Sequence, residues 1–293
     1  MLNADIPGTD AAYLLNMNLF FSDCIAVTFS KIDLQQFMAR SKKKFTRNVV
    51  LFLAGFFITG AACLFGYLWW MEQRASVIRY TEFGIPIPEG YSIHGIDVSR
   101  YQNIINWHSV KEMQVQGINI DFVFIKATEG IGDEDSYFKR NWRKAKEAGL
   151  TRGAYHFFLA TKDGTLQARN FIKKVRYTPG DLPPVVDVEQ TYGADKKLLQ
   201  QRLKAWLYAT ELAYGVKPII YTNVDFYKKY LAGEFDDYPL WAAHYLQPTA
   251  PRISRDWHFW QHSEKGKVNG IAAAVDFNVF NGDSTAFQEL LLK

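Results

Sequence analysis

Hydrophobic residues in the C-terminal two thirds of the chain fall into short apolar runs that alternate with amphipathic segments. The runs are rich in β-branched and aromatic residues, which is typical of buried strands. The segments between them have apolar positions at helical spacing. We predict strands at 93–98, 122–127, 153–158, 184–188, 219–221, 240–243, 259–260 and 275–280. We predict helices at about 109–116, 137–148, 165–175, 197–214, 226–230 and 284–292.

Eight strands with interleaved helices predict an α/β fold of the (β/α)8 barrel type. The last strands leave little room for helices between them, and about 200 residues is the lower limit for this fold, so we expect a reduced, irregular barrel. The alternative is an open doubly wound sheet, but no glycine-rich phosphate-binding loop opens any predicted helix. The barrel should occupy residues 91–293.

The N-terminal part has a different pattern. Residues 49–71 are 23 consecutive residues without a charge, and about 20 apolar residues span a bilayer core. Trp69 and Trp70 end the stretch as interfacial aromatics do, and residues 40–47 supply five positive charges before it. We therefore predict one uncleaved transmembrane helix with a cytoplasmic N-terminus. The alternative, a cleaved signal peptide, usually has an apolar region of only about 7–15 residues.

The remaining N-terminal segments follow from this helix. Residues 1–48 should be cytoplasmic. Because a sequence typical of a membrane-targeted bacterial protein begins at Met38, we hypothesise that residues 1–37 are not translated. Residues 72–90 should be a linker, since prolines and glycines interrupt regular structure there. The barrel would then lie on the periplasmic or extracellular side of a bacterial cytoplasmic membrane, tethered by a single pass.

Charge and cysteine content narrow the function. Residues 1–80 hold 8 Lys/Arg and 5 Asp/Glu, a net of +3, whereas residues 81–293 hold 26 and 25, a net of +1. A nearly neutral barrel gives no basic face for nucleic acid. Both cysteines, Cys24 and Cys63, precede the barrel, so it contains no disulfide. No His/Cys cluster has metal spacing. We predict no metal, no cofactor, no nucleic acid and no protein partner.

Candidate chemistry lies where the predicted strands end, because active sites of these barrels form at the C-terminal ends of the strands. Asp187 and Glu189 follow the apolar run 183–186 and are two residues apart, so they share one face of a strand. Two carboxyls that close perturb each other's pKa, as acid catalysis on a glycosidic bond requires. The other predicted strand ends carry Asp97, Tyr155, Tyr221, Trp241, Trp260, Gln261, Asp276 and Asn278.

Structural roles are the alternatives for these side chains. Asp97 and Asp276 could bond loop amides, and His156 could be a core histidine. The aromatic residues at the strand ends could be ordinary barrel packing. Lys126 and Glu129 more readily serve the fold or a loop than a reaction.

Several motifs resemble one family. The segments GIDVSRYQ at 95–102, KATEG at 126–130, GAYHF at 153–157, DVE at 187–189, WQ at 260–261 and DFN at 276–278 resemble, in order, the signature of the glycoside hydrolase family 25 lysozymes. The resemblance covers nearly all of 94–278 and excludes the first 90 residues. It implies a flattened, irregular β/α barrel. It also implies hydrolysis of the β-1,4 bond between N-acetylmuramic acid and N-acetylglucosamine in peptidoglycan.

The resemblance also implies residue roles. Glu189 would be the general acid, with a pKa raised by neighbouring carboxylates. Asp187 would stabilise the charge developing at the sugar by orienting its 2-acetamido group; the alternative is a covalent intermediate on Asp187 or Asp276. Asp97 and Asp276 would complete the catalytic set by closing the acidic floor of the groove. The expected substrate-binding residues are Tyr155, Tyr221, Trp241, Trp260, Gln261 and Asn278.

Two other functions remain as alternatives. One is a non-catalytic tether that binds peptidoglycan strands and holds them to the membrane, although binding alone does not need four converging carboxyls. The other is a chitinase-like hydrolase, but Val185 and Val186 stand where that family has spaced aspartates.

Overall fold

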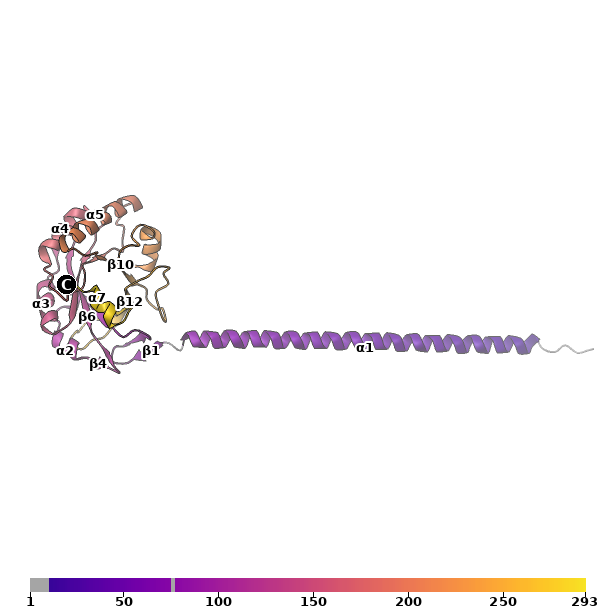
Figure 1. Ribbon diagram of the computed structural model, residues 1–293. Helices are drawn as coiled ribbons and strands as arrows, with labels where there is room; N and C mark the ends of the chain where they lie inside the picture. Colours follow the sequence, from indigo (N-terminus) through magenta and orange to yellow (C-terminus); the bar gives the residue numbers. More distant parts are fainter. Residues whose placement is uncertain (1–10, 75–76) are drawn as a thin grey trace, which may run out of the picture. The chain divides into compact units, whose positions relative to one another are not determined.

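The computed structural model describes residues 11–74 and 77–293, with side chains from residue 33 onward except at 72–79. Two compact units can be distinguished, Met1–Met71 and Glu72–Lys293. The described part of the first unit belongs to helix α1 (Ala11–Arg74), a single 64-residue helix whose last three residues fall in the second unit (Figure 1). Its part Asp33–Met71 is a candidate membrane span by length and composition, and it contains the predicted span at 49–71. Residues 1–10 of the expected cytoplasmic segment lie outside the described residues.

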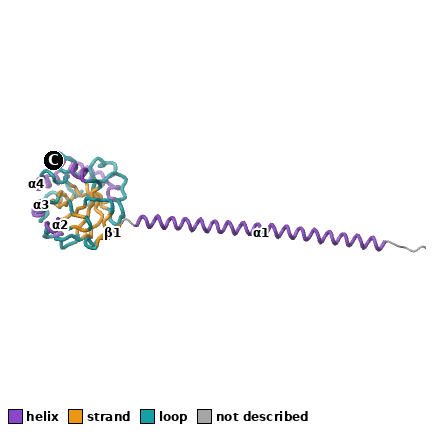
Figure 2. Tube along the Cα trace, turned by 60° about the horizontal axis from the view of Figure 1, so that its bottom comes forward, coloured by secondary structure: helices purple, strands orange, loops and turns teal. Residues whose placement is uncertain are grey.

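The second unit is a closed eight-stranded barrel, shown with its surrounding helices and loops in Figure 2. Going round the barrel, the strands follow the order β3, β13, β12, β11, β10, β9, β8 and β6, and a β3–β6 pairing closes it. All eight predicted strands are therefore confirmed. They are β3 (His94–Val98), β6 (Phe122–Glu129), β8 (Thr151–Phe157), β9 (Val185–Asp187), β10 (Ile219–Asn223), β11 (Leu240–Ala243), β12 (Phe259–Gly266) and β13 (Val275–Phe280).

The barrel is irregular because one strand runs against its neighbours. Strand β13 is antiparallel to both β12 and β3, whereas the other barrel pairings are parallel. A turn and loop at 267–274 connect β12 to β13 without a helix. The short β7 (Asp133–Glu134) extends the sheet beside β6. The helices are η1 (Arg100–Gln102), α2 (Trp107–Glu112), α3 (Phe138–Glu147), α4 (Gly164–Lys174), α5 (Lys196–Tyr214), α6 (Val224–Phe226), η2 (Tyr227–Leu231) and α7 (Ser284–Leu290).

One predicted helix is only half present. The range expected at about 109–116 ends as α2 at Glu112, and the chain continues into a small hairpin of β4 (Gln114–Val115) and β5 (Ile118–Asn119). Gln116 and Gly117 form its turn, with φ of 50° and 88°. A two-residue turn with both residues left-handed fits the twist of a hairpin, and this short-range signal overrides helical spacing.

Side chains of the barrel strands alternate between two apolar layers. Inward residues such as Phe122, Phe124 and Trp241 fill the barrel, and the rings of Phe124 and Trp241 stack with centroids 4.4 Å apart. Outward residues pack against the surrounding elements. Gly95 and Gly153 make room for the interior rings, because a Cβ at either position would lie 2.5 Å from Phe122 or Phe124. Gly95 and Gly153, which begin the motifs at 95–102 and 153–157, are therefore needed for packing inside the barrel.

A β-hairpin covers the antiparallel side of the barrel. It consists of β1 (Val77–Tyr80) and β2 (Ile85–Pro88), within the range expected to be a linker. Phe83 is fully buried and meets Phe277 of β13 edge to face at 5.2 Å, and the Phe83 carbonyl accepts a hydrogen bond from Lys267 N at 2.9 Å. The prolines do not prevent this structure, because β2 is an edge strand and edges tolerate proline.

Candidate active site

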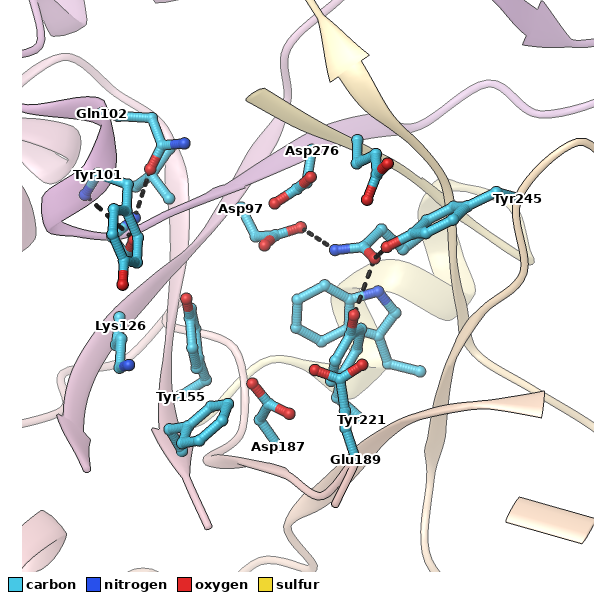
Figure 3. A pocket seen from close by; sticks show the side chains of 16 residues that line it. Asp97, Tyr101, Gln102, Lys126, Tyr155, Asp187, Glu189, Tyr221, Tyr245 and Asp276 are labelled. Atoms are coloured by element: carbon cyan, nitrogen blue, oxygen red, sulfur yellow. Dashed lines mark hydrogen bonds between the residues drawn. The ribbon is translucent and has the colours of Figure 1, made fainter. Parts of the chain in front are cut away.

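A cleft of about 360 Å³ lies at the C-terminal ends of the parallel strands. It brings together all four acids expected from the sequence, with Asp97 and Asp276 on one side and Asp187 and Glu189 on the other (Figure 3). The other lining residues are Val98, Ser99, Tyr101, Gln102, Lys126, Tyr155, Phe157, Tyr221, Trp241, Tyr245, Gln261 and Glu264.

Asp97 and Asp276 face each other across the antiparallel β3–β13 ladder. Asp97 Oδ2 accepts hydrogen bonds from Gln261 Nε2 and Asn278 Nδ2, both at 2.8 Å. These donors oppose the effect of burial, which raises the pKa of Asp97. Burial, followed by the charge of Asp97, raises the pKa of Asp276 to about 9. Asp276 therefore holds a proton at neutral pH, and of the two carboxyls Asp97, with its two amide donors, is the one that favours the ionised form.

Asp187 and Glu189 form the second pair, at the end of β9 and just beyond it. Burial and then the charge of Glu189 raise the pKa of Asp187 well above its ordinary value, whereas the charge of Lys126 lowers it. Burial also raises the pKa of Glu189. Both carboxyls are therefore shifted toward the protonated form, and in the free cleft burial favours the proton on Asp187, which is only 6% exposed. Within the described part of the chain, Asp187 Oδ1 is buried without a hydrogen-bond partner.

A hydrogen-bonded relay of side chains fixes Asp97. The hydroxyls of Tyr221 and Tyr245 both donate to Gln261 Oε1, at 2.8 and 2.6 Å, and the Gln261 amide donates to Asp97. Trp241 Nε1 donates to Asn278 Oδ1 at 2.7 Å, which orients the second amide. The carboxylate of Asp97 is thus set by partners on β10, β11, β12 and β13.

Lys126 is the cation of the cleft. Its ammonium lies 2.7 Å from Glu129 Oε2 and 4.6 Å from the centre of the Phe157 ring. Lys126 pairs in register with Tyr155, and Phe157 with Asp187. The positive charge therefore stands on the wall that leads to Asp187, where it favours the ionised carboxylate.

Two residues expected to bind substrate lie elsewhere. Trp260 is fully buried on the outer side of the barrel, where its indole donates to the His244 carbonyl at 2.9 Å. Neighbouring strand residues point to opposite faces, so Gln261 in the cleft places Trp260 outside it. Asn278 is also fully buried and contacts Asp97 and Trp241 from behind.

The core alternative is confirmed for one histidine. His156 is fully buried, bonds Thr128 Oγ1 at 2.7 Å and Gln167 Oε1 at 3.2 Å, and stacks on Trp206. Burial lowers its pKa to about 3, so it stays neutral.

Sequence reasoning missed Tyr245 and Glu264. Tyr245 follows β11 in a loop and has no strand pattern, and Glu264 lies in an extension of β12 well beyond the predicted end at residue 260. The polar residues 261–265 gave no strand pattern, and strict alternation from Gln261 would place Glu264 on the opposite face; the register shifts between Gln261 and Gly266 break that alternation. Within the described ranges, no group of three or more His, Cys, Asp or Glu side chains is placed to hold a metal ion.

Comparison with known sequences gives a consistent result. The profile of the glycosyl hydrolases family 25 matches residues 96–271. The uncharacterized protein YegX of Escherichia coli K12 is 49% identical over 200 residues, covering 68% of this chain and 74% of that protein. Lysozyme M1 of Streptomyces globisporus is 34% identical over 211 residues, covering 66% of this chain and 69% of the lysozyme.

Solved structures agree with these sequence matches. A family 25 glycosyl hydrolase from Bacillus anthracis superposes with a TM-score of 0.64 at 32% identity, covering 69% of this chain and 95% of the hydrolase. A bacterial lysozyme from Streptomyces coelicolor gives a TM-score of 0.61 at 32% identity, with coverages of 68% and 96%.

Proposed function

Because the chain belongs to the glycosyl hydrolases of family 25, we propose that it is a lysozyme of the N-acetylmuramidase type. It would cleave the β-1,4 bond between N-acetylmuramic acid and N-acetylglucosamine in peptidoglycan. The observation that carries this proposal is the convergence of Asp97, Asp187, Glu189 and Asp276 in one cleft at the strand ends. The family relationship makes the chain a glycosidase; the bond and the residue roles are the proposal.

Glu189 is the general acid in this proposal. The proton shared with Asp187 must be on Glu189 when the leaving oxygen departs, although burial favours it on Asp187 in the free cleft. An acetamido N–H of the substrate, donated to the Asp187 carboxyl, would stabilise its carboxylate form and return the proton to Glu189. Substrate binding itself would thus place the proton on Glu189, ready for transfer to the leaving oxygen.

Asp187 then acts on the sugar. As a carboxylate that holds the 2-acetamido N–H, it would direct the acetamido oxygen toward the anomeric carbon and stabilise the charge that develops there. The alternative is direct attack by a carboxylate, which needs carboxyl separations of about 5–5.5 Å. Asp276 is poorly suited to that role, because its raised pKa of about 9 keeps it protonated at neutral pH.

Tyr155, Tyr221, Trp241 and Gln261 line the cleft and would contact the sugars or hold the groups that do. Tyr245 and Glu264 join them on the wall formed by β11 and β12. Trp260 and Asn278 would not contact the substrate; they would support the residues of this wall through buried contacts.

The cellular setting is part of the proposal. The candidate span in Asp33–Met71 and the cationic residues at 40–47 support a single-pass anchor in a bacterial cytoplasmic membrane, with a cytoplasmic N-terminus. The barrel would then meet peptidoglycan from the outer side of that membrane.

Reducing-end analysis tests the function. Full-length protein in mild detergent is incubated with purified peptidoglycan, the products are reduced with borohydride, and the amino-sugar alcohols are identified after hydrolysis. A muramidase yields muramitol. Glucosaminitol instead, turnover of chitin oligomers alone, or glycan binding without new reducing ends would each contradict the proposal.

A further inference from the structure

The loop between β9 and α5 contains a backbone conformation that its sequence does not favour. Ala194 N donates to the Thr191 carbonyl at 2.9 Å, which closes a four-residue turn around Tyr192 and Gly193. The φ angles of these two central residues are 49° and 86°. Gly193 suits this left-handed region, but a tyrosine is strained there, since Asn, Asp and Gly are the usual residues.

A second turn in the same chain provides a reference. Gln116 and Gly117 have nearly the same φ angles, 50° and 88°, but they join the paired strands β4 and β5. Hairpin pairing explains the strain at Gln116. The turn at 191–194 connects a strand to a helix, so cross-strand pairing does not explain why Tyr192 is placed there. Strain that local structure does not require points to a use of the side chain.

The position of the Tyr192 ring indicates that use. The residue lies three positions beyond Glu189, and its side chain is 43% exposed rather than packed in the core. Burial raises the pKa of Tyr192, and the charges of Glu129, Asp187 and Glu189 raise it further. Tyr192 therefore lies in the loop that leaves the acid pair at the C-terminal end of β9, just outside the residues that line the cleft. In the proposed mechanism Glu189 protonates the leaving oxygen, so an exposed ring three residues further along the same loop is within reach of the leaving sugar.

We infer that Tyr192 binds the sugar on the leaving-group side of the scissile bond through its aromatic face, and so helps to determine specificity there. Aromatic faces at the walls of a cleft provide rigid apolar contact area, which suits the C–H face of a pyranose. In a muramidase this sugar is N-acetylglucosamine. The inference rests on the proposed function for the identity of the sugar, but not for the presence of the subsite.

Tyr192→Gly separates the ring from the turn, because glycine keeps the backbone conformation and removes the strain. We expect thermal stability to stay equal or rise. We expect kcat/KM on peptidoglycan oligosaccharides to fall at least tenfold, mainly through KM. Cleavage of an aryl glycoside, whose leaving group is not a sugar, should stay within threefold. Tyr192→Phe should keep most of the activity. Gln116→Gly, the matched control, should leave kcat/KM unchanged on both substrates.

A binding measurement makes the inference independent of turnover. In full-length protein carrying Glu189→Gln, adding Tyr192→Gly should weaken calorimetric binding of a peptidoglycan tetrasaccharide at least tenfold. Equal losses on oligosaccharide and aryl glycoside, or unchanged tetrasaccharide binding, would overturn the inference. If wild-type protein cleaves chitin oligomers but not peptidoglycan, the proposed function fails, and the same variants tested on chitin oligomers still decide the role of Tyr192.

Discussion

The two sides of the barrel contribute one carboxyl pair each, but they build it differently. On the parallel side, helices α3, α4 and α5 alternate with strands β6, β8, β9 and β10, and the pair Asp187–Glu189 lies at a strand end and in the loop after it. On the antiparallel side, hairpin β1–β2 covers strands β12 and β13, and the pair Asp97–Asp276 lies across one ladder.

The two pairs differ in how firmly their protonation state is fixed. Asp97 is held by two amide donors and its neighbour keeps the proton, so the antiparallel pair has a fixed state. Asp187 Oδ1 has no hydrogen-bond partner among the described side chains, so, unlike Asp97, this carboxyl is not held in one state by fixed amide donors. In the proposed mechanism the antiparallel side would supply a fixed charge, and the parallel side would perform proton transfer.

The largest expected effect is on the parallel side. Glu189→Gln removes the proposed proton donor but keeps the shape of the side chain, and general acid catalysis contributes about 10²–10⁴-fold in rate. We expect kcat to fall about 1000-fold, measured as the release of reducing ends from peptidoglycan. The exposed Glu147→Gln on α3 is the control and should match wild type. Near-normal turnover by Glu189→Gln would mean that another group donates the proton.

The packing of hairpin β1–β2 against the antiparallel side can be tested at Phe83. Replacing a fully buried phenylalanine by alanine costs about 3–5 kcal/mol. Phe83→Ala should lower the free energy of unfolding by about 3 kcal/mol in urea titrations of the barrel. Phe37→Ala on α1, whose side chain is 73% exposed, is the control. A loss below about 0.5 kcal/mol would show that the hairpin is a linker after all.

These two regions also show what sequence reasoning can reach. The eight strands and the four acids were predictable, because β-branched runs mark buried strands and alternation places Asp187 and Glu189 together. The hairpin β1–β2 could not be predicted, because Pro86 and Pro88 are typical of a break in regular structure. The burial of Phe83 could not be predicted either, because it depends on a contact with the distant strand β13, where no helix covers the β12–β13 connection. The placement of Trp260 outside the cleft followed from alternation with Gln261, which the sequence alone already contained.

Asp276→Asn tests whether the antiparallel pair is preset. A folded-state pKa of about 9 means that the folded chain holds a proton which the unfolded chain loses near pH 4, so stability falls as pH rises between these values. Asparagine removes this dependence. We expect equal unfolding free energies at pH 3 and a variant about 2 kcal/mol more stable at pH 7, a discounted figure because the group is partly exposed.

The same variant distinguishes two catalytic roles. If Asp276 only donates a hydrogen bond to Asp97, an asparagine amide can replace it and kcat should fall by no more than about tenfold. If Asp276 were the nucleophile, activity would fall as far as in Glu189→Gln. An unfolding free energy that differs from wild type by the same amount at pH 3 and pH 7 would likewise show that the proton on Asp276 is not preset.

The smallest single effects are expected in the relay to Asp97, where two tyrosines share one acceptor. Tyr221→Phe or Tyr245→Phe leaves the other hydroxyl on Gln261 Oε1, so each should lower kcat/KM by about fivefold or less, in line with about 1 kcal/mol for one hydrogen bond. The double variant frees the Gln261 amide to rotate away from Asp97. Its loss should exceed the product of the single losses, because neither single change removes the constraint on Gln261. If the loss of kcat/KM in the double variant equals the product of the single losses, the tyrosines act separately on the substrate. The charge on Asp97 is then not held through Gln261.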